Sequence, residues 1–390
     1  MQLDCRNSLP VDGTTGALVA RIWRPELAGP SVVALRGDDV VDITACFPTV
    51  RDLCEEAAPA TALRQASGER VCSLSALLAN TPPDDRDPAR PWLLAPIDLQ
   101  AIKAAGVTFA ISMLERVIEE KARGNPAAAV AIRTEITALV GDDLSRLKPG
   151  SAQAMALKQV LIDQGVWSQY LEVGIGPDAE IFTKAPPMAA VGSGSDAGLH
   201  PASSWNNPEP EVVLAVNSRA EIVGAALGND VNLRDIEGRS ALLLGKAKDN
   251  NASAAIGPFL RLFDATFTLD DLRAATLTLS VTGEDGFTLE GFSSMAQISR
   301  DPEDLVRQMM GPHHQYPDGA MLFLGTLFAP VKDRDHAGGG FTHKAGDIVR
   351  ISAPQLGALV NRMKRTDACA PWTFGCSHLM RNLAQRGLLR

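Results

Sequence analysis

The chain has 390 residues, of which 45% are hydrophobic and 21% charged, so it is long enough for a large core and about two domains. Its formal net charge is −9 and its basic residues are scattered, which argues against nucleic acid or an anionic membrane as a partner. Six cysteines without any C-x-x-C spacing argue against a zinc site and against a disulfide framework. The sequence opens without a signal segment and holds no apolar run near the ~20 residues that span a bilayer. We therefore expect a cytoplasmic protein.

Three regions follow one another along the chain. Residues 1–100 mix short strand-like runs with helical patches and end in "NTPPDDRDPARP", which is typical of a linker, so they predict a small N-terminal α/β domain. Residues 101–169 carry apolar residues at three- and four-residue spacing and predict a helical connecting region. In residues 170–390, short apolar runs alternate with turn-rich connections, which predicts a largely antiparallel sheet with a few outer helices. We expect catalysis in this third region.

The stretch "WNNPEPEVVLAV" places Glu209 and Glu211 on one face of a predicted strand, because alternate side chains of a strand share a face. If residues 218–221 form a four-residue hairpin loop, the returning strand sets Asp230 opposite Glu209. A five-residue loop would shift the register and turn Asp230 away. Three carboxylates on one face suit a hard cation, Mg²⁺ with Mn²⁺ or Ca²⁺ as substitutes. The alternative is two exposed strand-end glutamates and an aspartate that caps a helix.

Several motifs in order resemble the fumarylacetoacetate hydrolase family. They are "AEIFTKAPP", "EPEVVLAV", "GNDVNLRDIEG", "LLLGKAKDNNASAAIGPFL" and "LFLGTLF" followed by "KAGDIV". The resemblance implies an α+β fold, a mixed β-sandwich roll with outer helices, in which Glu209, Glu211 and Asp230 bind a divalent metal. The stretches "WNNPEPE", "MLFLGTLFAPVKDRD", "GFTHKAGD" and "PWTFGCSHLMRNLAQRGLL" are most similar to the 2-keto-3-deoxy-pentonate dehydratases, for xylonate- or arabinonate-type substrates. Such enzymes produce 2-oxoglutarate semialdehyde and water.

The resemblance also assigns roles to single residues. Glu180, in "AEIFTK", matches the acidic residue of proton transfer, and Lys246, in "GKAKD", matches the active-site lysine. Thr326, in "LGTL", matches the hydroxyl group that holds the substrate carboxylate. From the residues alone, Glu180 could equally be a charge at a strand edge and Lys246 a solvated surface lysine.

Three further residues are expected near the substrate. Lys184 is expected to pack its stem beside the site, and Arg234 is either a substrate ligand or a partner of Glu237. The helical stretch "SMLERVIEEK" keeps Ser112 and Arg116 where the family segment is richer in arginine and serine, so which of its residues reaches the substrate stays open.

The resemblance favours a Mg²⁺-dependent hydro-lyase for a small 2-keto-3-deoxy sugar acid. The alternative within the same fold is an acylpyruvate or diketo-acid C–C hydrolase, in which a histidine and a glutamate of a lid helix position water. The sequence contains no His-x-x-Glu, which favours dehydration. A third hypothesis is a binding protein that keeps the metal site without turnover. The resemblance further implies a homo-oligomer, a dimer or a tetramer.

Overall fold

The structure is a computed structural model, and it describes residues 1–123, 125, 129, 147–163, 165, 167–328, 330, 332–336 and 340–389. A large mixed sheet runs through the molecule. In spatial order its strands are β4 (Glu69–Ser73), β3 (Asp39–Asp42), β2 (Gly29–Arg36), β1 (Ala17–Arg24), β11 (Ala254–Leu262), β10 (Ile222–Asp230), β9 (Pro210–Val216), β14 (Ala320–Phe323), β6 (Ala101–Gly106) and β7 (Glu180–Ala185), with β5 (Trp92–Leu94) paired to β1. Apart from the parallel pair β14 and β6, the neighbours in this sheet are antiparallel.

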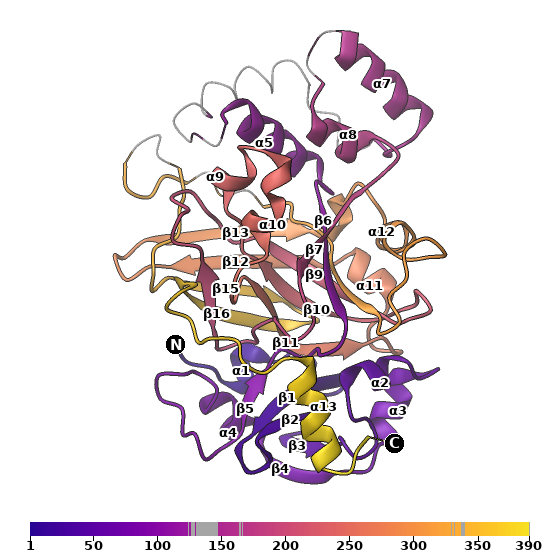
Figure 1. Ribbon diagram of the computed structural model, residues 1–390, viewed down its shortest axis with the longest axis vertical. Coiled ribbons are helices and arrows are strands. Elements are labelled where there is room, and N and C mark those ends of the chain that lie inside the picture. The colour runs from indigo at the N-terminus through magenta and orange to yellow at the C-terminus, as the bar shows by residue number, and fades with distance from the viewer. Residues whose placement is uncertain are drawn as a thin grey trace.

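A smaller sheet lies against the middle of the large one (Figure 1). Its strands, in spatial order, are β13 (Thr288–Ser294), β12 (Thr276–Thr282), β15 (Ile348–Ala353), β16 (Gly357–Arg365) and β8 (Asp196–Leu199). The described helices are α1 (Cys5–Ser8), α2 (Val50–Cys54), α3 (Pro59–Gln65), α4 (Leu74–Ala79), α5 (Ala110–Lys121), α7 (Ala152–Asp163), α8 (Gln169–Ile175), α9 (Arg234–Glu237), α10 (Leu244–Lys248), α11 (Leu269–Arg273), α12 (Pro302–Met309) and α13 (Cys376–Gln385). The predicted α+β class is confirmed.

The central strand β9 is buried along its whole length, which explains its nearly unbroken apolar sequence. Val212 and Leu214 belong to the core between the two sheets, together with Leu277 of β12. Val213, on the opposite face of β9, belongs to a second core that includes Leu53 of α2. Because successive side chains of a strand point to opposite faces, a strand covered on both sides has to be apolar at every position.

The N-terminal strands continue the large sheet. β1 pairs antiparallel with β11, with Val19 opposite Leu260, so residues predicted as a separate N-terminal domain share a hydrogen-bonded sheet with the third region. The C-terminal helix α13 packs on the same end of the molecule, where Asn382 donates a hydrogen bond of 2.8 Å to the Leu27 carbonyl oxygen (Figure 1). The region predicted as helical, 101–169, begins with a strand, β6, contains α5 and α7, and ends at the first residue of α8.

The hairpin between β9 and β10 differs from the predicted one but arrives at the same register. Val216 pairs with Ile222, so the loop has five residues, 217–221, in place of the expected four. The register then shifts between Ile222 and Gly224, which leaves Val223 as the extra residue of a β-bulge. Beyond the bulge the amide of Asp230 donates a hydrogen bond of 3.1 Å to the carbonyl oxygen of Glu209, so the two residues lie opposite each other as expected.

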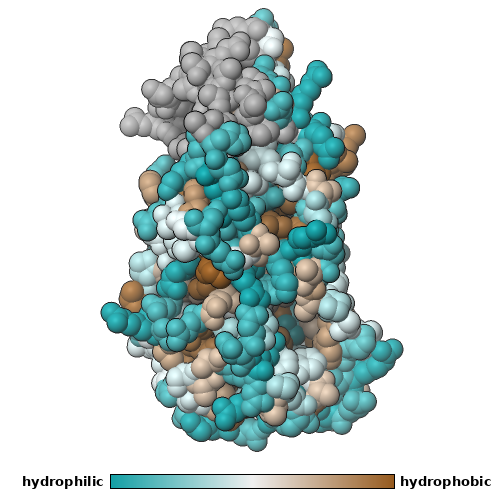
Figure 2. Space-filling model, turned by 90° about the vertical axis from the view of Figure 1, so that its left-hand side faces the viewer, coloured by the Kyte–Doolittle hydropathy of each residue, from teal (hydrophilic) through white to brown (hydrophobic). Residues whose placement is uncertain are grey.

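The surface is mixed in character. On the face shown in Figure 2, hydrophobic residues lie in small separate patches among hydrophilic ones. Among the helices of the described residues, none is both long enough and apolar enough to cross a membrane.

Candidate functional site

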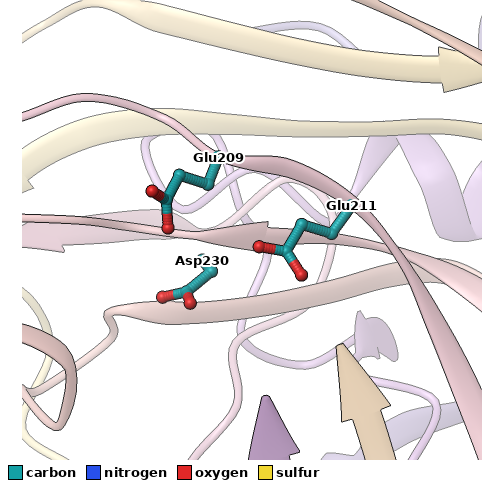
Figure 3. Close-up of side chains that lie close together, drawn as sticks. All are labelled: Glu209, Glu211 and Asp230. Carbon is teal, nitrogen blue, oxygen red and sulfur yellow. The ribbon is translucent and has the colours of Figure 1, made fainter. Parts of the chain in front are cut away.

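Three carboxylates meet at the end of the β9–β10 hairpin that is remote from its loop. Glu209 precedes β9, Glu211 lies within it and Asp230 is the last residue of β10. All three are buried, with exposed fractions of 4%, 3% and 1%, and one oxygen of each lies within 4.8 Å of the others. Figure 3 shows the three carboxylate groups close together. The structure thus brings together the three predicted metal ligands.

The electrostatics of this cluster suit a cation. Burial and the neighbouring charges of Asp230 and Glu209 raise the pKa of Glu211 well above its usual range. Burial also raises the pKa of Glu209. Burial acts to raise the pKa of Asp230 too, but the ammonium groups of Lys184 and Lys248 outweigh it and lower that pKa. A donor set of carboxylate oxygens fits Mg²⁺, and also Mn²⁺ or Ca²⁺.

Lys184, predicted near the substrate, is a fully buried anchor for Asp230. Its Nζ atom lies 2.7 Å from Oδ1 of Asp230. The same ammonium group donates hydrogen bonds to the carbonyl oxygens of Val231 and Lys248, at 3.2 and 2.6 Å, and to Ser253 Oγ at 3.3 Å. With its donors directed at protein groups, Lys184 fixes the position of one carboxylate.

The lysine of the cluster is Lys248, and the sequence-based choice of Lys246 needs correction. Nζ of Lys248 lies 2.5 Å from Glu209 Oε2 and 3.1 Å from Asp230 Oδ2, and these two charges hold its pKa above the usual range although burial alone would lower it. Lys246 is exposed. Both residues lie on α10, where a two-residue step turns the side chain by about 200°. The two lysines therefore face opposite sides, and only Lys248 faces the carboxylates.

Glu180 enters the site from the first residue of β7, opposite Gly106 of β6. A side chain at Gly106 would collide with the Glu180 carboxylate, so the glycine provides the space that this group occupies. Burial, and then the charge of Glu237, raise the pKa of Glu180 to about 7, against the opposing effects of Arg116 and Lys248. A carboxyl group with this pKa can accept and return a proton near neutral pH.

Two side chains hydrogen-bond to the backbone that directly precedes Glu180. The guanidinium group of Arg300 is buried and donates hydrogen bonds of 2.8 Å to the carbonyl oxygens of Val173 and Gly176 at the end of α8. Gln308, on α12, accepts a hydrogen bond of 2.6 Å from the amide of Ala179. These contacts fix the chain directly before β7 begins.

The loop after β14 supplies a backbone amide and a hydroxyl group. Gly325 donates a hydrogen bond of 2.7 Å to Oε2 of Glu211. Its φ angle of 85° lies in the left-handed region, and a side chain there would collide with Thr108. Thr326, the predicted carboxylate-holding residue, lines the same cavity, and its Oγ1 accepts a hydrogen bond of 3.1 Å from the Phe328 amide.

Arg116 reaches the cluster from α5. Its Nη2 contacts Oε1 of Glu209, and its Nη1 lies 2.9 Å from Oε2 of Glu237 at the end of α9. Glu237 thus has Arg116 as an ionic partner, and Arg234 lies buried with its Cζ atom 4.3 Å from the centre of the Trp205 ring. Arg234 also donates a hydrogen bond of 3.4 Å to Glu115 on α5. The side chain of Ser112 lies outside the described residues.

These groups surround a cavity of about 20 Å³, which is close to the space that one water molecule needs. Its described lining consists of Ala105, Gly106, Val107, Arg116, Glu180, Phe182, Glu209, Glu211, Asp230, Glu237, Lys248, Gly325 and Thr326. Of the residues predicted from sequence, Glu180, Thr326 and the three carboxylates are in this lining, whereas Lys184, Lys246 and Arg234 are not among the described lining residues.

Sequence reasoning did not select Lys248, Glu237 or Gly325 as site residues. "GKAKD" contains both lysines, but only the orientation of α10 distinguishes them. The glycine of "LGTL" directly after an apolar strand was a signal for Gly325, because such a position often needs a left-handed turn. Glu237 carried no signal of its own beyond its charge next to Gly238.

The chain is similar to known proteins in sequence. Residues 177–364 match the family described as fumarylacetoacetate (FAA) hydrolase C-terminal. The 2-dehydro-3-deoxy-D-arabinonate dehydratase of Saccharolobus solfataricus is 29% identical over 189 residues, 48% of this chain and 59% of that protein. The probable 2-keto-3-deoxyxylonate dehydratase of Haloferax volcanii is 28% identical over 192 residues, 49% of this chain and 62% of that protein. The chain thus spans about three fifths of the length of the curated relatives it matches.

Solved structures show a similar fold. A 2-keto-3-deoxy-D-arabinonate dehydratase complexed with magnesium and 2,5-dioxopentanoate superposes with a TM-score of 0.61 at 21% identity, over 89% of this chain and 99% of that one. A fumarylacetoacetate hydrolase from Exiguobacterium antarcticum superposes with a TM-score of 0.54 at 14% identity, over 90% of this chain and 99% of that one. These likenesses confirm the expected type of fold.

Proposed function

Because this chain belongs to the fumarylacetoacetate hydrolase family through residues 177–364, we propose that it is a Mg²⁺-dependent dehydratase of 2-keto-3-deoxy-pentonates. The substrate, of the xylonate or arabinonate type, becomes 2-oxoglutarate semialdehyde and water. The proposal is supported by the similarity to two proteins that are named as dehydratases of such acids. The observation that carries it is the cavity in which three buried carboxylates and the proton-transfer candidate Glu180 face one another.

We assign Glu209, Glu211 and Asp230 as the metal ligands, with Mn²⁺ or Ca²⁺ as substitutes for Mg²⁺. Their three close oxygens and their burial together fit a divalent cation. When bound, the ion supplies Lewis acidity that polarises the keto group of the substrate and makes its C3 proton removable. Lys184 and the Gly325 amide keep two of these carboxylates in place.

Glu180 is the proposed acid and base. Its carboxylate takes a proton from C3 and returns it to the hydroxyl group that leaves C4, so that one water departs and a C3–C4 double bond remains. Tautomerisation of this product gives the semialdehyde. Lys248, which stays an ammonium ion beside two carboxylates, offers positive charge to the substrate oxygens. Thr326 is proposed to bind the substrate carboxylate through its hydroxyl group.

The test is a turnover assay with added Mg²⁺ and each enantiomer of a 2-keto-3-deoxy-pentonate, in which a dehydrogenase reports the semialdehyde. We expect one enantiomer to be consumed with release of water, and Glu180→Gln to bind metal but turn over at least about a hundredfold more slowly. Two carbon fragments in place of one dehydrated acid would identify a C–C hydrolase. Metal binding without turnover of any 2-keto acid would identify a binding protein.

The metal assignment has a test of its own in Glu211→Gln. The substitution removes one charged ligand at constant volume, and burial already disfavours the charged form of Glu211 in the metal-free protein. We expect a folded variant whose melting temperature no longer rises with Mn²⁺, whereas that of the wild type does, because a ligand that binds the folded state stabilises it. An unchanged rise would remove Glu211 from the ligand set.

Homo-oligomeric assembly stays a prediction that light scattering tests.

A further inference from the structure

Both oxygens of Glu209 already contact a cationic side chain. Nη2 of Arg116 contacts Oε1, and Nζ of Lys248 lies 2.5 Å from Oε2. The side chains of Arg116 and Glu209 are only 13% and 5% exposed, so their attraction is little weakened by water. A metal ion that binds Glu209 therefore competes with these two contacts for the same carboxylate.

Of the two cationic side chains, Arg116 also contacts a carboxylate outside the metal cluster. Its Nη1 lies 2.9 Å from Oε2 of Glu237, which is itself buried. Lys248 is tied to Asp230 within the cluster. Arg116 is carried by α5 and Glu237 by α9, which lie beside each other above the ends of the sheet strands (Figure 1). Arg116 can thus leave Glu209 without losing its charge partner.

The size of the cavity points to the same movement. About 20 Å³ is enough for one water molecule, whereas a five-carbon acid is several times larger. Arg116 lines the cavity next to Glu209. Its withdrawal from Glu209 would widen the cavity on the side of α5.

We propose that Arg116 is a positioning residue that gives up its contact with Glu209 when a divalent cation binds there and keeps its contact with Glu237. This exchange frees one oxygen of Glu209 for the metal ion, and it enlarges the cavity. This inference rests on the metal site of the proposed function, and it concerns residues outside the assigned ligand set: Arg116 and Glu237.

The test is a double-mutant cycle on metal affinity, without substrate. The full-length protein is freed of metal with a chelator and titrated with Mn²⁺, and free Mn²⁺ is counted by electron paramagnetic resonance. We expect Arg116→Met to bind Mn²⁺ about tenfold more tightly, because one of the two competitors for Glu209 is gone. We expect Glu237→Gln to weaken binding, since the contact with Glu237 no longer helps to draw Arg116 away from Glu209.

The coupling between the two changes separates the exchange from plain electrostatics. If Arg116 never moved, its interaction with Glu237 would be equal in the metal-free and metal-bound protein, and the two effects on affinity would add. The exchange strengthens the Arg116–Glu237 pair when metal binds, so Glu237→Gln should weaken binding about fivefold more in the wild type than in the Arg116→Met background. The cycle needs all four proteins folded, which the circular dichroism of each checks, and the double variant loses opposite charges together and so keeps the net charge of the pair.

Lys121→Met is the matched control, since Lys121 is an exposed positive charge on the same helix. It should change the Mn²⁺ affinity by less than about twofold, because an exposed charge is screened. Unchanged affinity in Arg116→Met, or additive effects in the cycle, would overturn the exchange. If neither the wild type nor Arg116→Met binds Mn²⁺, the exchange and the metal site both fail. If the cycle behaves as expected but no sugar acid is turned over, the exchange stands and the substrate assignment fails.

Discussion

Glu180 links the site to the pH dependence of folding. Burial raises its pKa from 4.5 to about 7 in the folded chain. Below about pH 4.5 the carboxyl group is protonated in both the folded and the unfolded chain. Between about pH 4.5 and 7 it ionises in the unfolded chain alone, so the wild type should lose stability relative to Glu180→Gln as the pH rises through this window.

Urea unfolding of both metal-free proteins, followed from pH 4 to 8, measures this difference. Glu221→Gln provides a control of opposite sign, because a hydrogen bond from Asn217 lowers the pKa of the exposed Glu221. The Glu221 carboxylate contributes stability that is lost as the pH falls. The free energy of unfolding of the wild type should therefore rise relative to that of Glu221→Gln as the pH rises. A difference between wild type and Glu180→Gln that does not change with pH would contradict the buried, largely protonated state of Glu180.

The two lysines of α10 make a matched pair at the same scale. Lys248→Met removes the ammonium group between Glu209 and Asp230, and we expect turnover to fall by about a hundredfold or more. Lys246→Met removes an exposed ammonium group from the same short helix. Turnover and melting temperature should stay near those of the wild type. Steady-state kinetics on both variants decide which lysine belongs to the site.

Single residues also show what the sequence could and could not predict. The spacing of Glu209 and Glu211 was sufficient to place them together, because the period of a strand is two and does not depend on distant contacts. The choice between Lys246 and Lys248 needed the rotation of α10 about its axis, which packing against other elements determines. The same holds for Arg116, whose partners come from residues far along the chain.

At the scale of elements, α12 holds the start of β7 through Gln308. Gln308→Met removes the acceptor of the Ala179 amide, at a cost of about 1–3 kcal/mol, and loosens the backbone that carries Glu180. We expect kcat to fall about tenfold with little change in KM, because the acid and base group is misplaced while the substrate contacts remain. Steady-state kinetics and urea unfolding measure the two effects separately.

Two variants on α12 separate positioning from stability. Gln308→Glu keeps an acceptor for the Ala179 amide but lies against Asp304, which Gln308 contacts at 3.0 Å, so it should lose stability and keep kcat. Arg307→Met, at an exposed neighbouring position, should leave both unchanged. If kcat followed stability across the three variants, α12 would have no specific role in placing Glu180.

The hairpin shows why element boundaries were harder to predict than residue spacing. The five-residue loop is favoured by Asn217, whose side chain accepts hydrogen bonds of 3.0 Å from the amides of Arg219 and Glu221. Local pattern alone would then have placed Asp230 on the wrong face. The bulge at Val223 restores the register, and Gly224 directly after it was a local signal that sequence reasoning did not use, because a glycine inside a strand often marks a bulge.

At the scale of the whole molecule, the first hundred residues complete the large sheet. β11 takes β1 as its neighbour, and Leu260 shares a core with Val19 and Val32. A chain that begins at residue 101 would expose the edge of β11 and this apolar surface, so we expect it to aggregate or to unfold without cooperativity. Size-exclusion chromatography and urea unfolding check this expectation.

A nicked protein is the control for that truncation. Residues 83–90 form a stretch ahead of β5 that is exposed except at the half-buried Arg86, and a protease site placed there allows the full chain to be cut after folding. The cut protein should stay associated and keep its unfolding transition, because β1 and β11 remain paired. A soluble, cooperatively unfolding chain of residues 101–390 would contradict the role given to β1. This long-range pairing was not predictable from local composition, which is why the sequence alone suggested a separate domain.

The bulge at Val223 has a practical consequence for engineering the protein. It lies between the tip of the hairpin and the three carboxylates, and from Gly224 onward the pairs run without a further shift to Asn229 opposite Pro210. We therefore expect one residue added to loop 217–221 to lengthen the loop and to leave Asp230 opposite Glu209. Ser218 at the tip donates two hydrogen bonds of 2.7 Å to the Glu55 carboxylate, so an inserted residue that spares this contact should be tolerated best.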